Sequence, residues 1–542
     1  MAKEMDLSRY IGKKPVKPDG LVDAPILIIT EFPDDDAEDA GVPIAGKAAE
    51  RLYSALESAG IERAKTRTMA LCNYKLADNK FYYAEDSPQL KEGVANIEYA
   101  IKHHPPKIIL LLGEYSLQYM MHLFSIGDWR GSCLMLNGIK VIPTYNPIMP
   151  VMKDPTSLPG FYSDINRLAE FIDKPFPVIN WNFTLNPTGF GAQDCIKEIL
   201  SHDKYSVDIE SRKESIHIKC VGFGLSSNRA IVFANNGLDG ISSELRVTLD
   251  LLLDNDKGKI LHNSIFDVEM LYLNGVIVRN VIWDTMIAQH VLNLELKRGL
   301  DFLVSTYTYV PCYWAGTSRD NEKAWGDKVK PFDLHTYNAK DCCVTYQIAE
   351  EQEKELKGRE LEIFQYEMSM LEVSHHISRA GFTIDETRRG ELKERVTNNL
   401  VYHYSTLKAV IGRDINVASH KQVQELLFKE LQLPTQTKRT GQITSDEDAL
   451  VKLIGICKTE LVKYTSENKQ AEWTKKLAVC KIILIIRGLF KLITSYINAG
   501  VSPDGKARST WKVAATETGR WSASLYVDGT GVNSQTFPRD SY

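Results

Sequence analysis

The first third of the chain alternates short apolar runs with longer amphipathic stretches. The apolar runs are residues 25–30 (PILIIT), 107–112 (KIILLL) and 139–143 (GIKVI). Each run has the length of a buried strand, whereas KAAERLYSALESAG, which ends at Gly60, has the hydrophobic period of a helix. Buried strands that alternate with helices predict a layered α/β domain.

The pattern breaks around residues 171–194, where Pro, Gly and Asn interrupt every hydrophobic period. Beyond this break, YSVDIES, IKCVGFGLSS and RAIVFAN are strand-like runs joined by polar turns, which predict a meandering sheet. Helical periodicity then continues past residue 355 to about residue 500. Because a chain of 542 residues is too long for a single core, we expect three domains, at residues 1–175, 176–355 and 356–542.

The composition is that of an ordinary soluble protein, with 44% hydrophobic and 25% charged residues. The chain starts with the polar MAKEMDLSRY rather than with an apolar leader, and its longest apolar runs are too short to span a bilayer. The nine cysteines lack CxxC spacing, which favours reduced thiols over a zinc or iron–sulfur site. We therefore expect a cytoplasmic protein with neither a membrane partner nor an iron–sulfur cluster.

Charge is distributed unevenly along the chain. Residues 386–542 carry 24 Lys and Arg against 16 Asp and Glu, a net charge of +8, whereas residues 1–385 carry 41 against 54, a net charge of −13. A basic C-terminal third suits contact with a polyanion such as nucleic acid. Solvated helix faces would produce the same counts, so charge alone leaves both interpretations open.

Two carboxylates stand out in the predicted strand YSVDIES. Asp208 and Glu210 are two residues apart, so both project from one face, while Val207 and Ile209 point to the other. Burying two carboxylates together is costly unless a cation neutralises them. A DxE pair is by itself more often a solvated strand edge than a metal site, so further motifs must decide.

Two later motifs complete a pattern. HNSIFDVEML places Asp267 just after Asn263 and Phe266, and YNAKDCCVTY places Tyr337 and Asp341 four residues apart on one helical face. The order DxE, NxxFD and YxxxD, with WDTMIAQH before the last, resembles the proofreading 3′–5′ exonucleases of the four-carboxylate, tyrosine type. The resemblance implies a ribonuclease-H-like mixed sheet flanked by helices, in which Asn263 and Phe266 contact the DNA.

The chemistry of phosphodiester hydrolysis explains why such a family needs these residue types. Mg²⁺ and Mn²⁺ prefer oxygen ligands, and a pair of such ions supplies a hydroxide and stabilises the charge on the leaving 3′ oxygen. The resemblance implies two ions per site, with Asp208 bridging both. Glu210 and Asp341 would complete the binding of one ion, and Asp267 would support the other. Tyr337 would orient the attacking water.

The third block resembles the polymerase region of family A DNA polymerases. MSMLEVSHHISRAGFTID looks like the start of that region, and INVASHKQVQELLFKELQLP followed by KRTGQITSDEDALVKL is similar to its thumb. A thumb positions a duplex through its phosphates, so Lys421, Lys438 and Arg439 are candidate DNA contacts. Each of these cations is also compatible with an ordinary solvated surface.

The stretch TETGRWSASLYVDGTGVNSQTFPRDSY resembles the segment that leads from the thumb into the palm and grips the primer–template. Arg520 would hold a phosphate, and Asn533 and Gln535 suit the acceptors of a minor groove. Thr518 and Arg539 belong to the same expected set of DNA contacts. The family's palm aspartates lie beyond this segment, so we expect an incomplete polymerase site. A fragment, an interrupted gene or a second polypeptide that completes the palm and fingers would each account for it.

Three segments of the first block look like the uracil-DNA glycosylase superfamily, namely APILIITEFPDDDAEDAGVPIAGKAAERL, PPKIILLLGEYSLQYM and DWRGSCLMLNGIKVIPTYNPIMP. Such an enzyme flips a base out of the duplex and hydrolyses its glycosidic bond. Glu31, Asn73 and Asn146 would line the corresponding pocket. Because Asn146 replaces the family's loop histidine and cannot become a cation, we expect an inactive binding or docking domain, with an active glycosylase as the alternative.

These resemblances together predict the N-terminal portion of a phage-type family A DNA polymerase. It would be an α/β multidomain protein with a glycosylase-like layer domain, an exonuclease domain and a helical thumb with the start of a palm. Its expected activity is metal-dependent removal of 3′-terminal nucleotides from single-stranded or frayed DNA in the host-cell cytoplasm. The alternatives are a ribonuclease-D-like RNA exonuclease, which would not need the thumb, and a non-catalytic DNA-binding or replication-docking subunit, which would not need the carboxylates.

Overall fold

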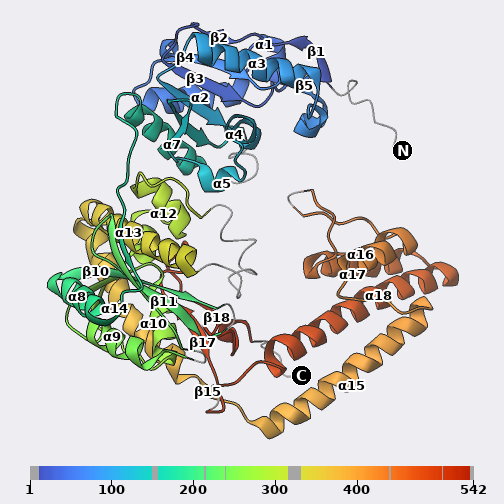
Figure 1. The fold of residues 1–542 in the computed structure, drawn as a ribbon. Coiled ribbons are helices and arrows are strands. Elements are labelled where there is room, and N and C mark those ends of the chain that lie inside the picture. The colour runs from blue at the N-terminus through green and yellow to red at the C-terminus, as the bar shows by residue number, and fades with distance from the viewer. Residues whose placement is uncertain are drawn as a thin grey trace, which may run out of the picture. The chain divides into compact units, whose positions relative to one another are not determined.

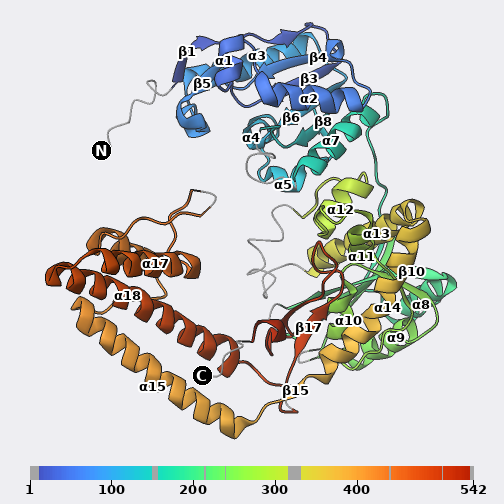
Figure 2. The same cartoon turned by 180° about the vertical axis from the view of Figure 1, so that it is seen from behind.

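The computed structural model describes residues 11–148, 157–212, 215–237, 240–314, 331–438, 441–502 and 504–537. The chain divides into two compact units, Met1–Glu372 with Val513–Arg520 and Val373–Lys512 with Trp521–Tyr542. Figures 1 and 2 show the ribbon from opposite sides. Arg439 and Arg539, both expected to contact DNA, lie outside the described residues.

The first unit begins with a six-stranded sheet whose centre is built from the expected apolar runs. Its strands lie in the order β2 (Asp19–Gly20), β4 (Thr66–Ala70), β3 (Ile26–Thr30), β6 (Ile108–Leu112), β8 (Ile139–Thr144) and β7 (Leu134–Leu136). The four central strands are parallel, and β2 and β7 pair antiparallel at the edges. Parallel strands of this kind are buried on both faces.

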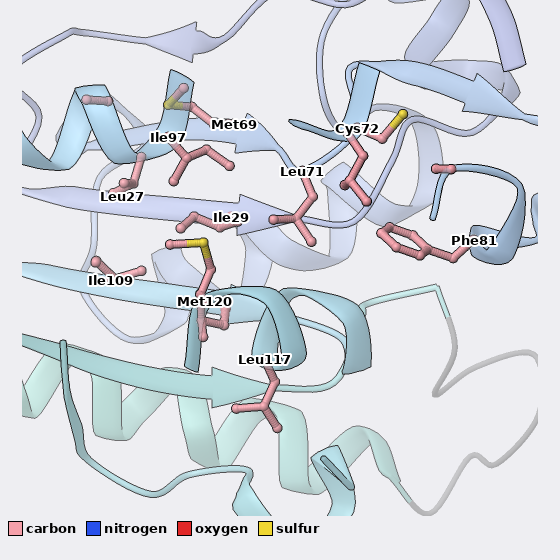
Figure 3. Packing of buried hydrophobic residues seen from close by; sticks show 14 of the residues in the cluster. Leu27, Ile29, Met69, Leu71, Cys72, Phe81, Ile97, Ile109, Leu117 and Met120 are labelled. Carbon is pink, nitrogen blue, oxygen red and sulfur yellow. The ribbon is translucent and has the colours of Figure 1, made fainter. Parts of the chain in front are cut away.

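Two apolar cores lie on opposite faces of this sheet. Leu27 and Ile29 of β3 pack in one core, and Ile26 and Ile28 pack in the other, as the pleat of a strand requires. Figure 3 shows the first core, with side chains from neighbouring strands gathered beneath helical ones. The helices of this domain are α1 (Asp35–Ala40), α2 (Gly46–Ser58), α3 (Pro88–His103), α4 (Glu114–Met121), α5 (Ile126–Trp129) and α7 (Ser157–Phe171). The prediction of a layered α/β domain is confirmed.

A second six-stranded sheet follows, and it is mixed. Its strands lie in the order β14 (Val281–Asp284), β13 (Gly258–Leu261), β10 (Lys204–Ser211), β11 (Ile218–Gly224), β12 (Arg229–Ala234) and β9 (Asn182–Leu185). β10, β11 and β12 form an antiparallel meander, while β13, β14 and β9 pair parallel to their neighbours. The sequence predicted the meander, and the exonuclease resemblance implied the mixed sheet.

One helix of this domain packs unusually close to the sheet. The helices are α8 (Gly189–Ser201), α9 (Ser243–Leu253), α10 (Ser264–Leu273), α11 (Thr285–Leu292), α12 (Leu300–Tyr307), α13 (Pro331–Glu355) and α14 (Gly358–Ala380). A Cβ at Gly222 of β11 would lie 2.3 Å from Asn338 Oδ1, and one at Gly224 would lie 2.7 Å from the carbonyl oxygen of Cys342. The two glycines therefore let α13 approach β11.

The second unit is mainly helical, as its hydrophobic period predicts. Its helices are α15 (Glu386–Ile411), α16 (His420–Gln424), α17 (Glu447–Lys463) and α18 (Glu467–Leu492), with π-helical turns at Glu425–Glu430 and Ile493–Ile497. α15, α17 and α18 share an apolar core. Two short antiparallel pairs complete the unit, β15 (Phe382–Thr383) with β16 (Lys506–Ala507) and β17 (Ser509–Lys512) with β18 (Ser522–Leu525). Across the described parts of the chain, every helix is too short or too polar to cross a membrane.

Candidate metal centre

The central strand β10 carries the first two carboxylates of the candidate site. Val207 and Ile209 are 2% and 6% exposed, whereas Asp208 and Glu210 project from the opposite face and are half-buried. Alternation along a strand thus separates the apolar pair from the acidic pair, as the sequence predicts. Asn338 of α13 donates from Nδ2 to Asp208 Oδ2 at 2.7 Å, so the acidic face of the strand lies against this helix.

α13 supplies the third carboxylate. Tyr337 and Asp341 stand one helical turn apart on this helix. One carboxylate oxygen from each of Asp208, Glu210 and Asp341 lies within 4.8 Å of the other two. Three carboxylates from a strand and a helix more than 130 residues away in the chain therefore share one small volume.

The fourth carboxylate comes from the first turn of α10. Asp267 is 4% exposed, and its Oδ1 accepts a hydrogen bond of 3.2 Å from the backbone nitrogen of Ile209. Ile209 lies between Asp208 and Glu210 in β10, so the Asp267 side chain reaches the strand at the site itself. Asp267 stands outside the closest group of three, which fits the supporting role that the resemblance implies.

Asp284, in the WDTM segment, fixes the turn that leads into α10. It is the N-cap of α11, where its Oδ1 accepts from the backbone nitrogen of Met286 at 2.8 Å. The same carboxylate accepts from the backbone nitrogens of Asn263 at 3.2 Å and Ser264 at 2.7 Å. Asn263 has a φ of 58°, a left-handed conformation that Asn tolerates. Asp284 therefore positions Asp267 without belonging to the metal centre.

Burial raises the pKa of each carboxylate in this group, and repulsion between members of the group adds to the effect at Asp208 and Glu210. Burial, followed by the charges of Asp341, Asp267 and Glu210, raises the pKa of Asp208 well above its ordinary value. Burial, followed by the charges of Asp341 and Asp267, also raises the pKa of Glu210 well above its ordinary value. Burial raises the pKa of Asp267 to about 8 and that of Asp341 to about 7. A cation placed among these groups would relieve both the burial cost and the repulsion.

Two tyrosines adjoin Asp341, of which the sequence motif identified one. Tyr337 and Tyr313 both hydrogen-bond the Asp341 carboxylate, and the Tyr313 hydroxyl donates to Oδ1 at 2.5 Å. Their rings meet edge to face, with centroids 5.7 Å apart. The charge of Asp341, followed by burial, raises the pKa of Tyr337 far above its ordinary value. Tyr337 therefore stays protonated and suits orienting a water rather than deprotonating it.

Sequence reasoning missed Tyr313 and Asn338. Asn338 lies inside the motif YNAKD, one residue after Tyr337, and a polar residue within a metal-site helix was a usable signal. Tyr313 lies in VPCYW, between the second and third motifs, where no spacing rule connects it to the carboxylates. Its role depends on a tertiary contact.

A cavity of about 240 Å³ opens beside Asp341. It is lined by Asp128, Leu300, Asp301, Tyr313, Trp314, Tyr337 and Asp341. Aromatic rings of this kind offer stacking surfaces for unpaired bases, next to the carboxylates. Asp128 belongs to α5, so the first domain also contributes to the lining.

The donor set fits a hard divalent cation. Mg²⁺ and Mn²⁺ prefer carboxylate oxygens, and three such oxygens lie close enough here to share an ion. The neighbouring thiols of Cys220 and Cys342 would favour softer metals only as thiolates. Burial raises the pKa of both thiols well above the ordinary value, so they remain protonated.

The expected DNA contacts from the motif and the thumb have different surroundings. Asn263 and Phe266 are half-buried in the turn and first residues before Asp267, beside the metal centre. Lys421 and Lys438 are exposed in the second unit. Lys438 stands in a tight turn, where its carbonyl accepts from the backbone nitrogen of Gly441.

Some of the expected DNA contacts between residues 518 and 535 have exposed side chains, while others already form hydrogen bonds within the protein. Thr518 and Arg520 are exposed. Asn533 Oδ1 accepts from the backbone nitrogen of Gln535 at 3.1 Å. The Gln535 amide bonds two backbone groups at the start of β18, at 2.9 and 3.0 Å. Gln535 would have to exchange these bonds in order to contact a base.

The candidate pocket of the first domain is held by hydrogen bonds within the protein. Asn146 Nδ2 donates to Glu31 Oε2 at 3.1 Å, and the backbone nitrogen of Tyr115 donates to Glu31 Oε1 at 3.0 Å. Burial raises the pKa of Glu31 despite these two donors. Asn73 lines a different cavity of about 260 Å³, together with Arg67 and other residues. The structure brings Glu31 and Asn146 together but places Asn73 elsewhere.

The second domain therefore has the fold and the clustered acids of a metal-dependent nuclease. Comparison with protein families agrees with this assignment. A family described as 3′–5′ exonuclease matches residues 188–357, and the uracil DNA glycosylase superfamily matches residues 18–165.

Two DNA polymerases and one solved structure are similar to longer parts of the chain. The chain is 24% identical over 630 residues to a DNA polymerase of Bacillus phage SP01, covering 99% of this chain and 65% of that protein. It is 24% identical over 378 residues to DNA polymerase I of Geobacillus stearothermophilus, covering 67% of this chain and 39% of that protein. A solved structure of the POL domain of Pol1 from M. smegmatis, in complex with DNA primer-template and dNTP, aligns with 66% of this chain and 56% of that chain at a TM-score of 0.46 and 19% identity.

The chain spans less than two thirds of the length of each of these relatives. It carries a uracil-DNA-glycosylase-like domain followed by a 3′–5′ exonuclease domain, and its relatives are family A DNA polymerases.

Proposed function

We propose that this chain belongs to a phage-type family A DNA polymerase and that its second domain proofreads, removing 3′-terminal nucleotides from single-stranded or frayed DNA. One observation carries the proposal. Oxygens of Asp208, Glu210 and Asp341 lie within 4.8 Å of one another, in a domain that the 3′–5′ exonuclease family matches. Bringing three acids with raised pKa values together is costly, and a bound cation would offset that cost.

Each side chain has a distinct part in the proposed reaction. Asp208, Glu210 and Asp341 would hold Mg²⁺ or Mn²⁺, two ions per site, with Asp267 supporting the second. Bound ions of this kind supply a hydroxide at neutral pH and stabilise the charge on the leaving 3′ oxygen. Tyr337, whose hydroxyl stays protonated, orients the attacking water, and the cavity beside Asp341 excludes bulk solvent from the terminal nucleotide.

The remaining predicted partners belong to the same proposal. Lys438 and Arg520 would each contribute a phosphate contact to the primer–template. The proposed site of this activity is the host-cell cytoplasm, which the similarity to a phage DNA polymerase supports. A second polypeptide that completes the polymerase site stays a prediction, which co-purification of this chain with a polypeptide carrying the palm aspartates tests.

The experiment uses the full chain, labelled single-stranded DNA and Mg²⁺. We expect release of mononucleotides from the 3′ end, abolished by EDTA and by Asp208→Ala. Asp203→Ala is the matched control, because Asp203 is a fully exposed carboxylate just before the same strand. RNA of the same sequence separates a DNA exonuclease from an RNA-trimming enzyme. Degradation that survives both EDTA and Asp208→Ala, or that prefers RNA, contradicts the proposal.

A further inference from the structure

One segment, residues 300–314, comprises α12 and the extended residues that follow it, and it links the first domain to the metal centre. The segment shares an apolar core with α13. The buried members of this core are Phe302, Leu303, Val304, Val310, Cys312, Trp314, Val344 and Ile348. At its end, Tyr313 donates its hydroxyl to Asp341. What holds this segment therefore determines how Tyr313 meets the carboxylate.

Arg130 of the glycosylase-like domain holds the helical half of the segment. Its side chain is 1% exposed and pairs with Asp164, which is equally buried, through Nε and Oδ2 at 2.9 Å. Arg130 Nη1 donates to Ser305 Oγ of α12 at 2.8 Å, and its guanidinium lies 5.1 Å from the centre of the Phe302 ring. An arginine has enough donors in a fixed plane to serve its own domain and α12 at once.

Two more contacts hold the end of α12 and the extended residues that follow it. Arg167 donates from Nη1 to the carbonyl oxygen of Gly131 and from Nη2 to that of Thr306, both at 3.0 Å. Ser132 Oγ accepts from the backbone nitrogen of Cys312 at 3.1 Å. Cys312 immediately precedes Tyr313, so the glycosylase-like domain is bonded to the residue that delivers the tyrosine.

The burial of these contacts separates them from an ordinary surface association between domains. Arg130, Asp164 and Ser132 are each at most 2% exposed. Both members of the buried ion pair belong to the first domain, so the pair holds the Arg130 guanidinium in the position from which it donates to Ser305. A buried polar group that loses its hydrogen-bond partner is costly. The bonds from Arg130 to Ser305 and from Cys312 to Ser132 therefore hold the segment in one position against the first domain.

We propose that the glycosylase-like domain is a structural support for the exonuclease site, and that Ser132 and Arg130 act by fixing the segment from which Tyr313 orients Asp341. This inference rests on the proposed exonuclease function of that site. Tyr313 is a positioning residue, because its hydroxyl contacts a metal-binding carboxylate rather than the reacting atoms. The first domain would then serve the exonuclease whether or not it binds a base of its own.

The test uses Tyr313→Phe in the full chain, with Tyr307→Phe as the matched control. Tyr307→Phe removes a hydroxyl of α12 that donates to Gln289 and also hydrogen-bonds Glu355, neither of which belongs to the metal centre. A hydrogen bond to a charged group is worth about 1.5–3 kcal/mol, which corresponds to about tenfold or more in rate. We expect kcat of Tyr313→Phe to fall about tenfold, with KM for DNA unchanged and the Mg²⁺ concentration at half-maximal rate raised. Tyr307→Phe should leave all three at the wild-type values.

The role of the glycosylase-like domain is tested by adding Ser132→Ala. If Ser132 acts through Tyr313, Ser132→Ala lowers kcat and raises the Mg²⁺ requirement in the same direction, and the double variant with Tyr313→Phe is no worse than Tyr313→Phe alone. Additive effects of the two substitutions, or a wild-type Mg²⁺ profile in Ser132→Ala, overturn the proposal. A wild-type chain that shows no Mg²⁺-dependent nuclease at all overturns the proposed function instead, so the two failures are distinguishable.

Discussion

Glu31 in the glycosylase-like domain and Glu210 in the exonuclease domain are both acids whose pKa burial raises, but their neighbours differ. Glu31 accepts from a backbone N–H of α4 and from the amide of Asn146, and both bonds lower its pKa against the effect of burial. Glu210 faces the charges of Asp341 and Asp267, which raise its pKa further, with Lys219 acting in the opposite sense. A buried carboxylate that accepts hydrogen bonds, such as Glu31, can stabilise its domain. A buried carboxylate surrounded by other carboxylates, such as Glu210, needs a cation to offset the repulsion.

Glu210→Gln gives the largest effect that this comparison predicts. Removing one of the carboxylates that we propose bind metal should lower the exonuclease rate by about 10³-fold or more, since residues that act as a unit fail together. Because one repulsive charge disappears, the same variant should melt about 2–4 °C higher than the wild type in EDTA. Nuclease assays and calorimetry measure the two effects. A variant that loses activity by becoming less stable would contradict this account of the site.

Glu31→Ala should lower the stability of the protein, whereas Glu210→Gln should raise it. It leaves the Tyr115 N–H and the Asn146 amide without their acceptor, which costs about 1–3 kcal/mol of unfolding free energy. Calorimetry of the first domain's transition measures the loss. Glu57→Ala, at an exposed position of α2, is the control and should stay within about 0.5 kcal/mol of the wild type. An unchanged transition in Glu31→Ala would show that the two donors do not depend on the carboxylate.

A smaller effect is expected in the pH dependence of stability. Because the pKa of Glu31 is raised above 4.5 in the folded chain, the folded state keeps a proton that the unfolded state loses as the pH rises past 4.5. The unfolding free energy therefore falls as the pH rises from 4.5 through the folded pKa. Glu31→Gln does not titrate, so its melting temperature should fall less than that of the wild type over the same range. Equal slopes in the two proteins would contradict the assignment.

No effect at all is expected when the full chain meets a uracil-containing oligonucleotide. The Glu31 carboxylate is bonded to Asn146, and Asn146 cannot carry the positive charge of the family's histidine. Incubation in EDTA, which silences the nuclease, followed by alkali should leave the oligonucleotide intact. Strand cleavage at the uracil would restore a catalytic role for the pocket.

Much of this architecture follows from local patterns in the sequence. The strands at residues 26–30, 108–112 and 139–144 coincide with apolar runs, and the face shared by Asp208 and Glu210 follows from the two-residue period of a strand. Such features depend on neighbours in the chain, so spacing rules capture them. The helical second unit was predictable for the same reason.

The features that escaped prediction depend on contacts between distant segments. Tyr313 meets Asp341, which is 28 residues away in the sequence, and Arg130 meets Ser305 across two domains. Asn73 lines a cavity of about 260 Å³ whose lining includes neither Glu31 nor Asn146. Neither hydrophobic period nor motif spacing carries information about such pairings.

Gly222 of β11 shows that the metal centre also depends on a contact between distant segments. Because Gly222 has no Cβ, α13 can approach β11 closely and bring Asp341 near Asp208. A Cβ at this position would overlap Asn338 Oδ1 and Cys342 Sγ. Gly222→Ala would push α13 away from β11 and so move Asp341 away from Asp208, although all four carboxylates of the site would remain in the chain. The spacing of the carboxylates thus depends on a glycine, a residue that has no functional group and takes no direct part in the proposed chemistry.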